Sequence, residues 1–528
     1  MRRKLCLITL VVLLAVTWAG WWWHAERRLA AIDERHRDAG LPTTIRAYND
    51  VHETGPSTPN GFVGTLESAE AAHDWYAAPT PRMSNDEFYP WEMASLDPQW
   101  RLLMRESLAA NAAFFQAAAT VNNLPIDPPI PLRENMNWRL SGARNIANGL
   151  TDEALYRHVQ GDTATAFARL ETVERLADHL RGGPNTIAFL VCSGIDALNT
   201  ATLQQIAPTL RPDAQGLDRQ VLRALIGRLL DNSGNLDRFL RSQHGDLLWS
   251  RHNVDQLASS VWVIRPKVKL DFARYADQIA PLRAPMEAGD FQTASGLFSH
   301  LVPKYEFLNG PADHSPAKAA GRELFFDASI MDQTVSVYFR ERFDAEIAAI
   351  SLAVAMYVED HGVYPAELDA LVPAYLPHVP GDVFSPDQAP LCYVMLRWPD
   401  GAPRPVIVSV GENGVADISA NLRPDTVPTR DVWPLDPVPA TPLYGGHMHT
   451  DPITDFTTNE IDDAYRDLSA PALYGPLPDA WRTAYEQELR ARRSYRQEPR
   501  SDPNLVGPEQ FTDDTDFGYR YDFDFGGF

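Results

Sequence analysis

The sequence predicts a mainly α-helical protein that is held in a membrane by its N-terminus. An uncharged apolar run follows a basic start, apolar residues then recur at helical spacing up to residue 360, and the end of the chain is rich in Pro and Asp. These observations divide the chain into five parts: a cytoplasmic stub and transmembrane helix (1–24), a charged helix with an irregular segment (25–99), an all-α multi-helix body (100–327), a long helix with a small α+β module (328–418), and a Pro- and Asp-rich linker with a largely disordered acidic tail (419–528).

The composition excludes several classes of protein. Lys and Arg number 47 against 70 Asp and Glu, a net charge of -23, and beyond residue 40 only Leu489 to Arg500 is rich in Arg, so we expect no nucleic-acid partner. The chain of 528 residues is long enough to bury a large core. The cysteines Cys6, Cys192 and Cys392 contain no CxxC pair, so they predict neither a disulfide framework nor a zinc ribbon.

The N-terminal apolar run, Leu5 to Trp23, is long enough to cross a bilayer. At about 1.5 Å per residue it nearly spans a hydrocarbon core of about 30 Å. Trp21 to Trp23 lie where an aromatic belt belongs, and Arg27 and Arg28 follow it. We therefore expect the chain to contact the membrane through Leu5 to Trp23.

Two alternatives stay open for this segment. A cleaved signal peptide has the same order of basic, apolar and small residues, but its apolar region is usually shorter, and three consecutive Trp are a poor cleavage context, so we favour a retained anchor. Basic residues flank both ends of the run, which leaves the positive-inside rule ambiguous. We expect a single-pass protein of the bacterial inner membrane with its body outside the cytoplasm.

The body contains one helical hairpin that is similar to a tetratricopeptide repeat. Apolar residues at helical spacing run from Ile146 to Val159 and from Ala166 to Leu176, on either side of a Gly161-Asp162 turn. No second copy follows at that period, so the sequence does not predict a solenoid.

The longest predicted helix, about Ala328 to Asp360, has one apolar face from Phe339 to Val358 and should end at Gly362. This face is expected to be buried in the core; a coiled coil or partner groove is the alternative. Two strands, Cys392 to Leu396 and Pro405 to Val410, are predicted to form a hairpin.

The segment from about residue 345 to 417 resembles the C-terminal module of type II secretion major pseudopilins. The resemblance depends on Tyr364-Pro365 followed by Leu368 to Val372, on Pro380, Asp382 and Phe384, and on Ser409, Gly411 and Gly414. It implies a long helix, a turn and a small sheet. The N-terminal span lacks the Glu-bearing element of a pseudopilin, and the helical body separates it from this module, so the usual assembly into a pseudopilus is not expected.

The whole layout up to about residue 420 also resembles a group of bacterial single-span membrane proteins with a helical body and a tail of this kind. That resemblance implies an architecture and no activity.

The sequence contains none of the common nucleotide, hydrolase or zinc signatures, and we predict no cofactor and no catalytic residue. Glu412, Asn413 and Asp417 offer oxygen ligands that suit calcium, and the corresponding loop region of pseudopilins binds calcium, although a simple turn after the strand is the favoured interpretation. His447 and His449, with Asp451 and Asp455, could gather a divalent metal, but a solvated loop is favoured.

Two His–Asp pairs could act as oriented bases, namely His244 with Asp246 and His252 with Asp255, although helix-surface pairs are favoured. The sequence therefore predicts a non-enzymatic scaffold or protein-interaction protein of the bacterial envelope, connected with a secretion apparatus. The alternative is a membrane-tethered hydrolase whose carboxylates converge only in the folded body.

Overall fold

The computed structural model describes residues 2–52, 104–105, 108–124, 137–260, 265–299, 316–397, 403–411 and 432–434. This part of the chain is mainly helical, as the sequence predicts. The helices are α1 (Arg2–Asp38), α2 (Ile45–His52), α5 (Ala112–Ala119), α6 (Asn137–Val159), α7 (Thr163–Leu180), α8 (Thr186–Ile206), α9 (Arg219–Leu230), α10 (Ser233–Ser260), α11 (Arg265–Ile279), α12 (Arg283–Ala288), α13 (Phe291–Ser299) and α15 (Pro316–His361). Short 3₁₀ turns are η2 (Thr120–Asn123), η3 (Ala207–Thr209), η4 (Ala280–Leu282) and η6 (Leu368–Leu371).

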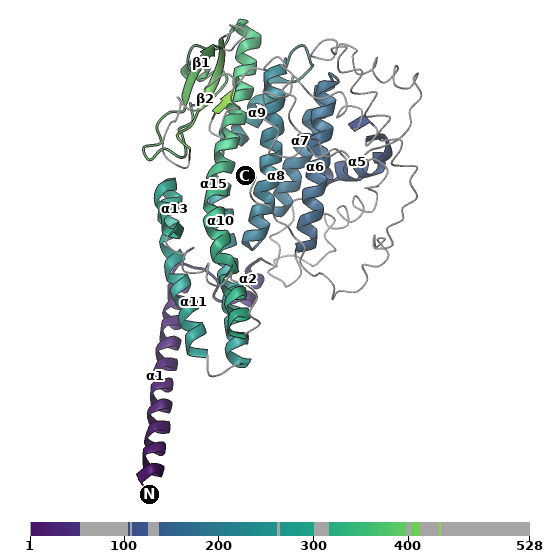
Figure 1. Ribbon diagram of the computed structural model, residues 1–528. Helices are drawn as coiled ribbons and strands as arrows, with labels where there is room; N and C mark the ends of the chain where they lie inside the picture. The colour runs from purple at the N-terminus through teal and green to yellow at the C-terminus, as the bar shows by residue number, and fades with distance from the viewer. Residues whose placement is uncertain are drawn as a thin grey trace, which may run out of the picture.

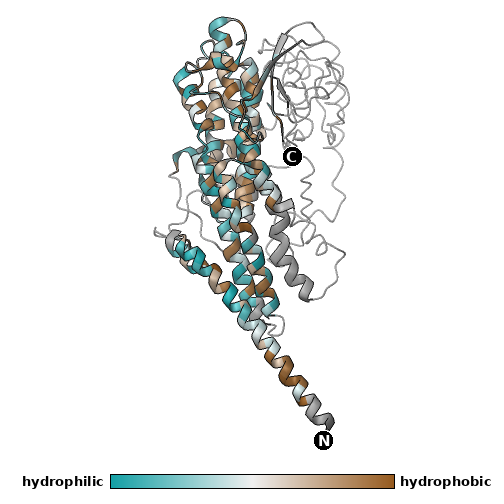
Figure 2. Cartoon of the chain, turned by 90° about the vertical axis from the view of Figure 1, so that its left-hand side faces the viewer, coloured by the Kyte–Doolittle hydropathy of each residue, from teal (hydrophilic) through white to brown (hydrophobic). Residues whose placement is uncertain are grey.

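Helix α1 joins the apolar run to the body without a break. Its apolar half projects from the rest of the molecule with exposed side chains, whereas Ala25, Leu29 and Ile32 are buried against the body (Figures 1 and 2). By length and composition, residues 8–38 contain a candidate membrane span. Helix α8 also passes that test, but it is largely buried, as a core helix is.

The core surrounds α15, which lies beside α8, α9 and α10 (Figure 1). The predicted apolar face of this helix is buried at Phe339, Phe343, Ile347 and Val354, which confirms the expectation of core burial. The helix begins at Pro316, earlier than predicted, because its first residues are mostly good helix formers and Pro is tolerated at the first position. It ends where predicted: the N–H of Gly362, at φ 70°, donates to the carbonyl of Val358 at 2.8 Å.

The predicted hairpin is formed by α6 and α7. Gly161 adopts φ 85°, which only glycine enters at little cost, and the side chain of Asp162 caps α7 by accepting from the N–H of Thr165 at 3.3 Å. A second cluster of apolar side chains fills the space between this hairpin, α5 and one face of α8. Helix α8 thus buries side chains on two sides, Phe189 against Phe239 of α10 and Ile195 toward the hairpin.

The predicted strands pair as an antiparallel hairpin, β1 (Cys392–Arg397) with β2 (Pro403–Val408), with Tyr393 opposite Ile407. A third strand, β3 (Val432–Pro434), pairs with β2 and places Trp433 opposite Ile407. The sequence predicts only a Pro- and Asp-rich linker and a largely disordered tail from residue 419, so β3 is a regular element that it does not predict. Its only proline, Pro434, is the last residue of an edge strand, where a missing N–H costs little. The remainder of the predicted disordered tail lies outside the described residues.

Candidate functional site

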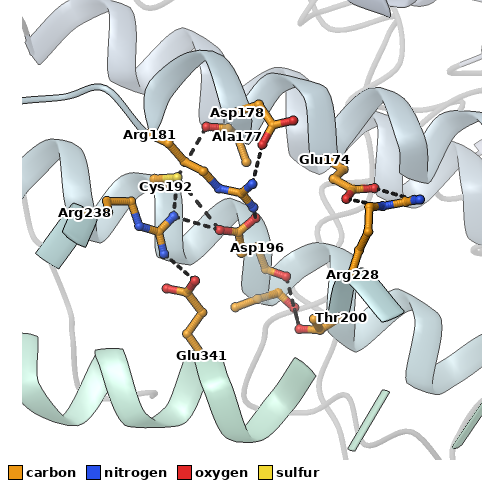
Figure 3. A network of polar contacts seen from close by, with 11 residues as sticks. Glu174, Ala177, Asp178, Arg181, Cys192, Asp196, Thr200, Arg228, Arg238 and Glu341 are labelled. Atoms are coloured by element: carbon orange, nitrogen blue, oxygen red, sulfur yellow. Dashed lines mark hydrogen bonds and ion pairs between the residues drawn. The ribbon is translucent and has the colours of Figure 1, made fainter. Parts of the chain in front are cut away.

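A largely buried group of ionisable side chains lies between α8, α10 and α15 (Figure 3). The guanidinium of Arg238, from α10, donates from Nη1 to Oδ2 of Asp196 at 3.0 Å and to Sγ of Cys192 at 2.9 Å, both on α8. Its Nη2 forms a buried ion pair with Glu341 of α15. One cation therefore ties three core helices together.

A second arginine extends this group toward α7. Arg181 donates from Nη2 to Oδ1 of Asp196 at 3.2 Å and pairs with Asp178. Asp196 thus accepts from two guanidinium groups that come from different parts of the chain. We refer to Asp178, Arg181, Cys192, Asp196, Arg238 and Glu341 as the buried ionic network.

Burial shapes the proton affinities in this network. Desolvation raises the pKa of Glu341, and the neighbouring Arg238 opposes the rise. Burial likewise raises the pKa of Asp178 against the pull of Arg181, and it raises the pKa of the Cys192 thiol to about 12 despite Arg238. Cys192 is therefore a neutral thiol. Its S–H donates to the carbonyl oxygen of Ala177, with 3.5 Å between Sγ and that oxygen.

The centre of the network is closed to solvent, whereas Arg181 at its edge keeps 39% of its side chain exposed. Cys192 is fully buried, and Arg238 and Glu341 are nearly so. A nucleophile or general base needs access to a substrate and a matched pKa, and the thiol has neither in this conformation. Chemically, the arrangement suits a fixed cross-brace of charges between helices.

Sequence reasoning missed this network because its members are distant along the chain. The available signal was weak: Asp196 is a charged residue between apolar neighbours, Ile195 and Ala197, but Arg238 and Glu341 stand next to other charged residues. Such residues pair only when helix packing has been solved, and helical periodicity alone does not give the partner of each helix.

The structure separates the predicted pair of His244 and Asp246. His244 Nε2 donates to the carbonyl of Pro42 at 2.8 Å, and the His36 ring packs edge-on against it. Asp246 instead accepts from the N–H of Thr186, the first residue of α8, at 2.8 Å. Both side chains are buried, so the expected helix-surface pair is wrong: the two residues fasten α10 to different segments.

The second predicted pair also diverges. His252 Nε2 lies 2.7 Å from the side chain of Gln256, whereas Asp255 pairs with Arg251 at 3.1 Å and Lys269 at 3.6 Å. Neither predicted pair forms a base-and-orienter arrangement. Both are structural contacts of α10.

In the small module, Asp382 joins the turn after α15 to the end of β2. Its Oδ1 accepts from the Ser409 hydroxyl at 2.9 Å, and its Oδ2 accepts from the N–H of Val410 at 2.7 Å. The Ser409 Oγ in turn accepts from the N–H of Gly411 at 2.9 Å. We call these contacts the Asp382 latch.

The latch ends where the predicted calcium ligands begin. Glu412, Asn413 and Asp417 lie outside the described residues, as do His447, His449, Asp451 and Asp455. Within the part of the chain that the structure describes, no group of three or more His, Cys, Asp and Glu side chains is arranged to hold a metal ion.

Comparison with known proteins assigns no family to this chain: no family model, no curated protein and no solved structure matches it.

Proposed function

We propose that this chain is a membrane-anchored, non-enzymatic scaffold or protein-interaction protein of the bacterial envelope that works with a secretion apparatus. The observation that carries the proposal is the continuity of α1. The helix leaves the apolar run and enters the core with Ala25, Leu29 and Ile32 buried, so the body is held against the membrane surface through a packed helix and not through a flexible linker.

The buried ionic network supports a structural role for the body. It braces four helices by paired charges, and the Cys192 thiol, Arg238 and Glu341 at its centre are sequestered from solvent. Buried ion pairs add little net stability, but breaking one is costly, so they favour one packing arrangement over others. A body fixed in this way suits the presentation of surfaces to partners.

The link to secretion is supported by the small module at the end of α15. Asp382 and Ser409 belong to the two short motifs of the pseudopilin resemblance, and they are joined by the latch. At the same end of the body, Val363 is exposed directly after α15, and Val221 is exposed on α9. Because Val363 is exposed beside the module, a photoreactive residue at this position can report a partner contact.

A membrane-tethered hydrolase is the second candidate, and one observation favours it. Asp178, Asp196 and Glu341 converge in the body, and burial raises the pKa of two of them, as catalytic acids often require. The candidate needs an opening that admits substrate to Cys192 or Glu341. Glu341→Gln also breaks the buried pair with Arg238, so helix content measured by circular dichroism first identifies a folded variant. In a folded variant, a scaffold retains its partner contacts and a hydrolase loses its acid.

A photo-crosslinking experiment tests the leading proposal. The full chain carries a photoreactive residue at position 363, with position 274 on α11 as the exposed control, in cells with an intact or a deleted type II secretion system. We expect a crosslink from position 363 to a secretion component, absent from position 274 and from the deletion strain. A chain that gives the same crosslinks in both strains contradicts the secretion link.

Membrane anchorage is tested separately. A reporter that is active only outside the cytoplasm is fused after residue 434, so that β3 is kept. We expect an active, full-length fusion that resists extraction from membranes by alkaline carbonate. A soluble, shortened product would instead mean cleavage of the N-terminal segment.

A further inference from the structure

The first turn of α11 lies beside the aromatic belt of α1. The guanidinium carbon of Arg265 is 5.9 Å from the ring centre of Trp22, and Nη2 is 3.7 Å from Oε1 of Glu26. The ammonium of Lys269 lies 2.7 Å from the same carboxylate oxygen. Residues 265–269 are therefore level with residues 22–26 of the helix that leaves the membrane.

The next contacts along both helices fix their direction. Asp277, two turns further along α11, pairs with both Arg28 and Arg35. The two helices thus run parallel, with the start of α11 as its membrane-proximal end (Figure 1). In Figure 2 the hydropathy of α1 changes from apolar to polar where it meets the other helices.

Residues 22–26 of α1, with residues 265–269 beside them, lie at the level expected for the lipid headgroups. A bilayer of about 40–45 Å with a hydrocarbon core of about 30 Å leaves roughly 6 Å of headgroup region on each side. At about 1.5 Å per residue, that region spans about four residues of α1 beyond the Trp belt. Arg27 caps the belt, with its guanidinium 4.7 Å from the ring centre of Trp23. Arg265, which contacts Trp22, and Lys267, two residues further along α11, lie level with this part of α1.

The charge at this height is opposite to that of the whole chain. The net charge of the protein is -23, yet residues 22–28 and 265–269 hold Arg27, Arg28, Arg265, Lys267 and Lys269 against Glu26. The basic residues stay in excess when Asp255 and Asp271, which pair with Lys269 and Lys267, are included. Lys269 is neutralised by Glu26, and Lys267 pairs with Asp271 one turn further along α11. The Lys267 side chain nevertheless stays 65% exposed, and Arg27 is exposed as well. The connection before α11, Val261 to Ile264, is apolar in sequence and lies outside the described residues.

We propose that the first turn of α11 and the adjoining stretch of α1 form a binding surface for the anionic phospholipid headgroups of the leaflet on the side of the body. Clusters of basic residues next to a membrane span attract anionic lipids in this way. The inference rests on the membrane anchor of the proposed function and adds a second element, α11, to the membrane contact. With two helices on the lipid surface, the body is held in one orientation.

Lipid selectivity at the protein boundary tests the proposal. The full chain is reconstituted in phosphatidylcholine, and the association of spin-labelled phosphatidylglycerol relative to spin-labelled phosphatidylcholine is measured by electron spin resonance. The variant Arg265→Gln/Lys267→Gln removes two charges from α11, and the variant Arg274→Gln/Arg283→Gln removes two charges further along the chain. We expect the first variant to lower the relative association at least about twofold and the second to leave it unchanged.

The outcomes separate this proposal from the anchor itself. If a change of Arg27 to Gln lowers the selectivity while the α11 variant leaves it unchanged, only α1 touches lipid and the proposal is overturned. If added inorganic phosphate displaces the spin-labelled phosphatidylglycerol as effectively as unlabelled phosphatidylglycerol does, the proposal is also overturned, because the surface would then be a phosphate site. If the chain fails to reconstitute at all, the anchor has failed. Lys267→Gln alone, at an exposed position, serves where the double variant unfolds, and it should lower the selectivity in the same direction.

Discussion

The ammonium of Lys269 lies 2.7 Å from Oε1 of Glu26, and this ion pair joins the helix that leaves the membrane to α11. The two side chains differ in their surroundings: Lys269 is 4% exposed, whereas Glu26 is 35% exposed. Asp255 of α10 approaches the same ammonium at 3.6 Å. The buried partner is the cation, and the carboxylates that neutralise it face water on one side.

This asymmetry predicts unequal effects of removing either partner. Glu26→Gln leaves a buried ammonium with only the more distant Asp255, and we expect it to lower the free energy of unfolding by about 1–3 kcal/mol. Lys269→Met keeps the aliphatic contacts and leaves two carboxylates that water can solvate, so its cost should stay within about 1 kcal/mol. Thermal unfolding of the full chain in detergent measures both, and a larger loss for Lys269→Met would refute the argument.

The buried ionic network predicts a large effect at Arg238. Arg238→Met leaves Asp196 and Glu341 buried without their shared cation, and we expect a loss of about 3–5 kcal/mol in the free energy of unfolding. Arg238→Met/Glu341→Met should regain at least half of that loss, because the second change removes one of the stranded carboxylates. Arg228, which pairs with Glu174 at 2.8 Å and is half-exposed, is the matched control. Arg228→Met should change stability by less than about 1 kcal/mol; denaturant titration distinguishes the cases.

The elements that the sequence predicts well are those with a long, regular period. The apolar face of α15 and the turn at Gly161-Asp162 follow from local rules, namely helical spacing and the preference for glycine at positive φ. Strand β3 could not be predicted in the same way, because a segment of three residues with a terminal proline has no period of its own. It is stabilised by pairing with β2, which no local pattern indicates.

The candidate site was harder to predict than the fold for the same physical reason. His244 and Asp246 are adjacent enough in sequence to suggest a pair, yet the carbonyl of Pro42 and the N–H of Thr186 offer each of them a different partner. Conversely, Arg238 and Glu341 form a buried pair that no sequence spacing indicates. The partners are chosen by tertiary packing, which satisfies buried polar groups wherever the nearest donor or acceptor lies.

The carboxyl group of Glu346 predicts a dependence of stability on pH. Burial raises its pKa to about 7, against the pull of Arg342, whose Nε lies 3.0 Å from Oε1. A carboxyl with a raised folded pKa binds its proton more tightly when folded, so its stabilising contribution is complete below the ordinary pKa of about 4.5 and is lost as the pH rises through about 7. We expect the free energy of unfolding to fall across this window, by about 1–3 kcal/mol from this group.

Glu346→Gln tests this dependence, because it removes the titration while keeping the shape of the side chain. The variant should flatten the curve between pH 5 and pH 8 and should be more stable than the parent at pH 8. Some dependence should remain, since burial also raises the pKa of Asp344 to about 7. A variant with the same pH profile as the parent would show that Glu346 does not titrate in this range.

The close approach of α10 to the loop before α8 predicts that Gly245 tolerates no side chain. A Cβ atom at this position would lie 1.7 Å from the carbonyl oxygen of Pro184, and backbone on the other side cannot yield as a flexible side chain can. The same stretch of α10 holds Thr186 through Asp246, so a shift of the helix also strains that hydrogen bond. We expect Gly245→Ala to lower the free energy of unfolding by about 2–4 kcal/mol, as overpacked core positions do.

Gly227 provides the matched control for this prediction. It lies within α9, and a Cβ atom there would meet no other atom within 4 Å. Because alanine loses less conformational entropy than glycine in a helix, Gly227→Ala should raise the free energy of unfolding by about 0.5–1 kcal/mol. Opposite signs for the same substitution in two helices, measured by thermal unfolding under one condition, would isolate the contact with Pro184 as the cause. A stabilising Gly245→Ala would instead mean that α10 and the loop before α8 are further apart than this packing requires.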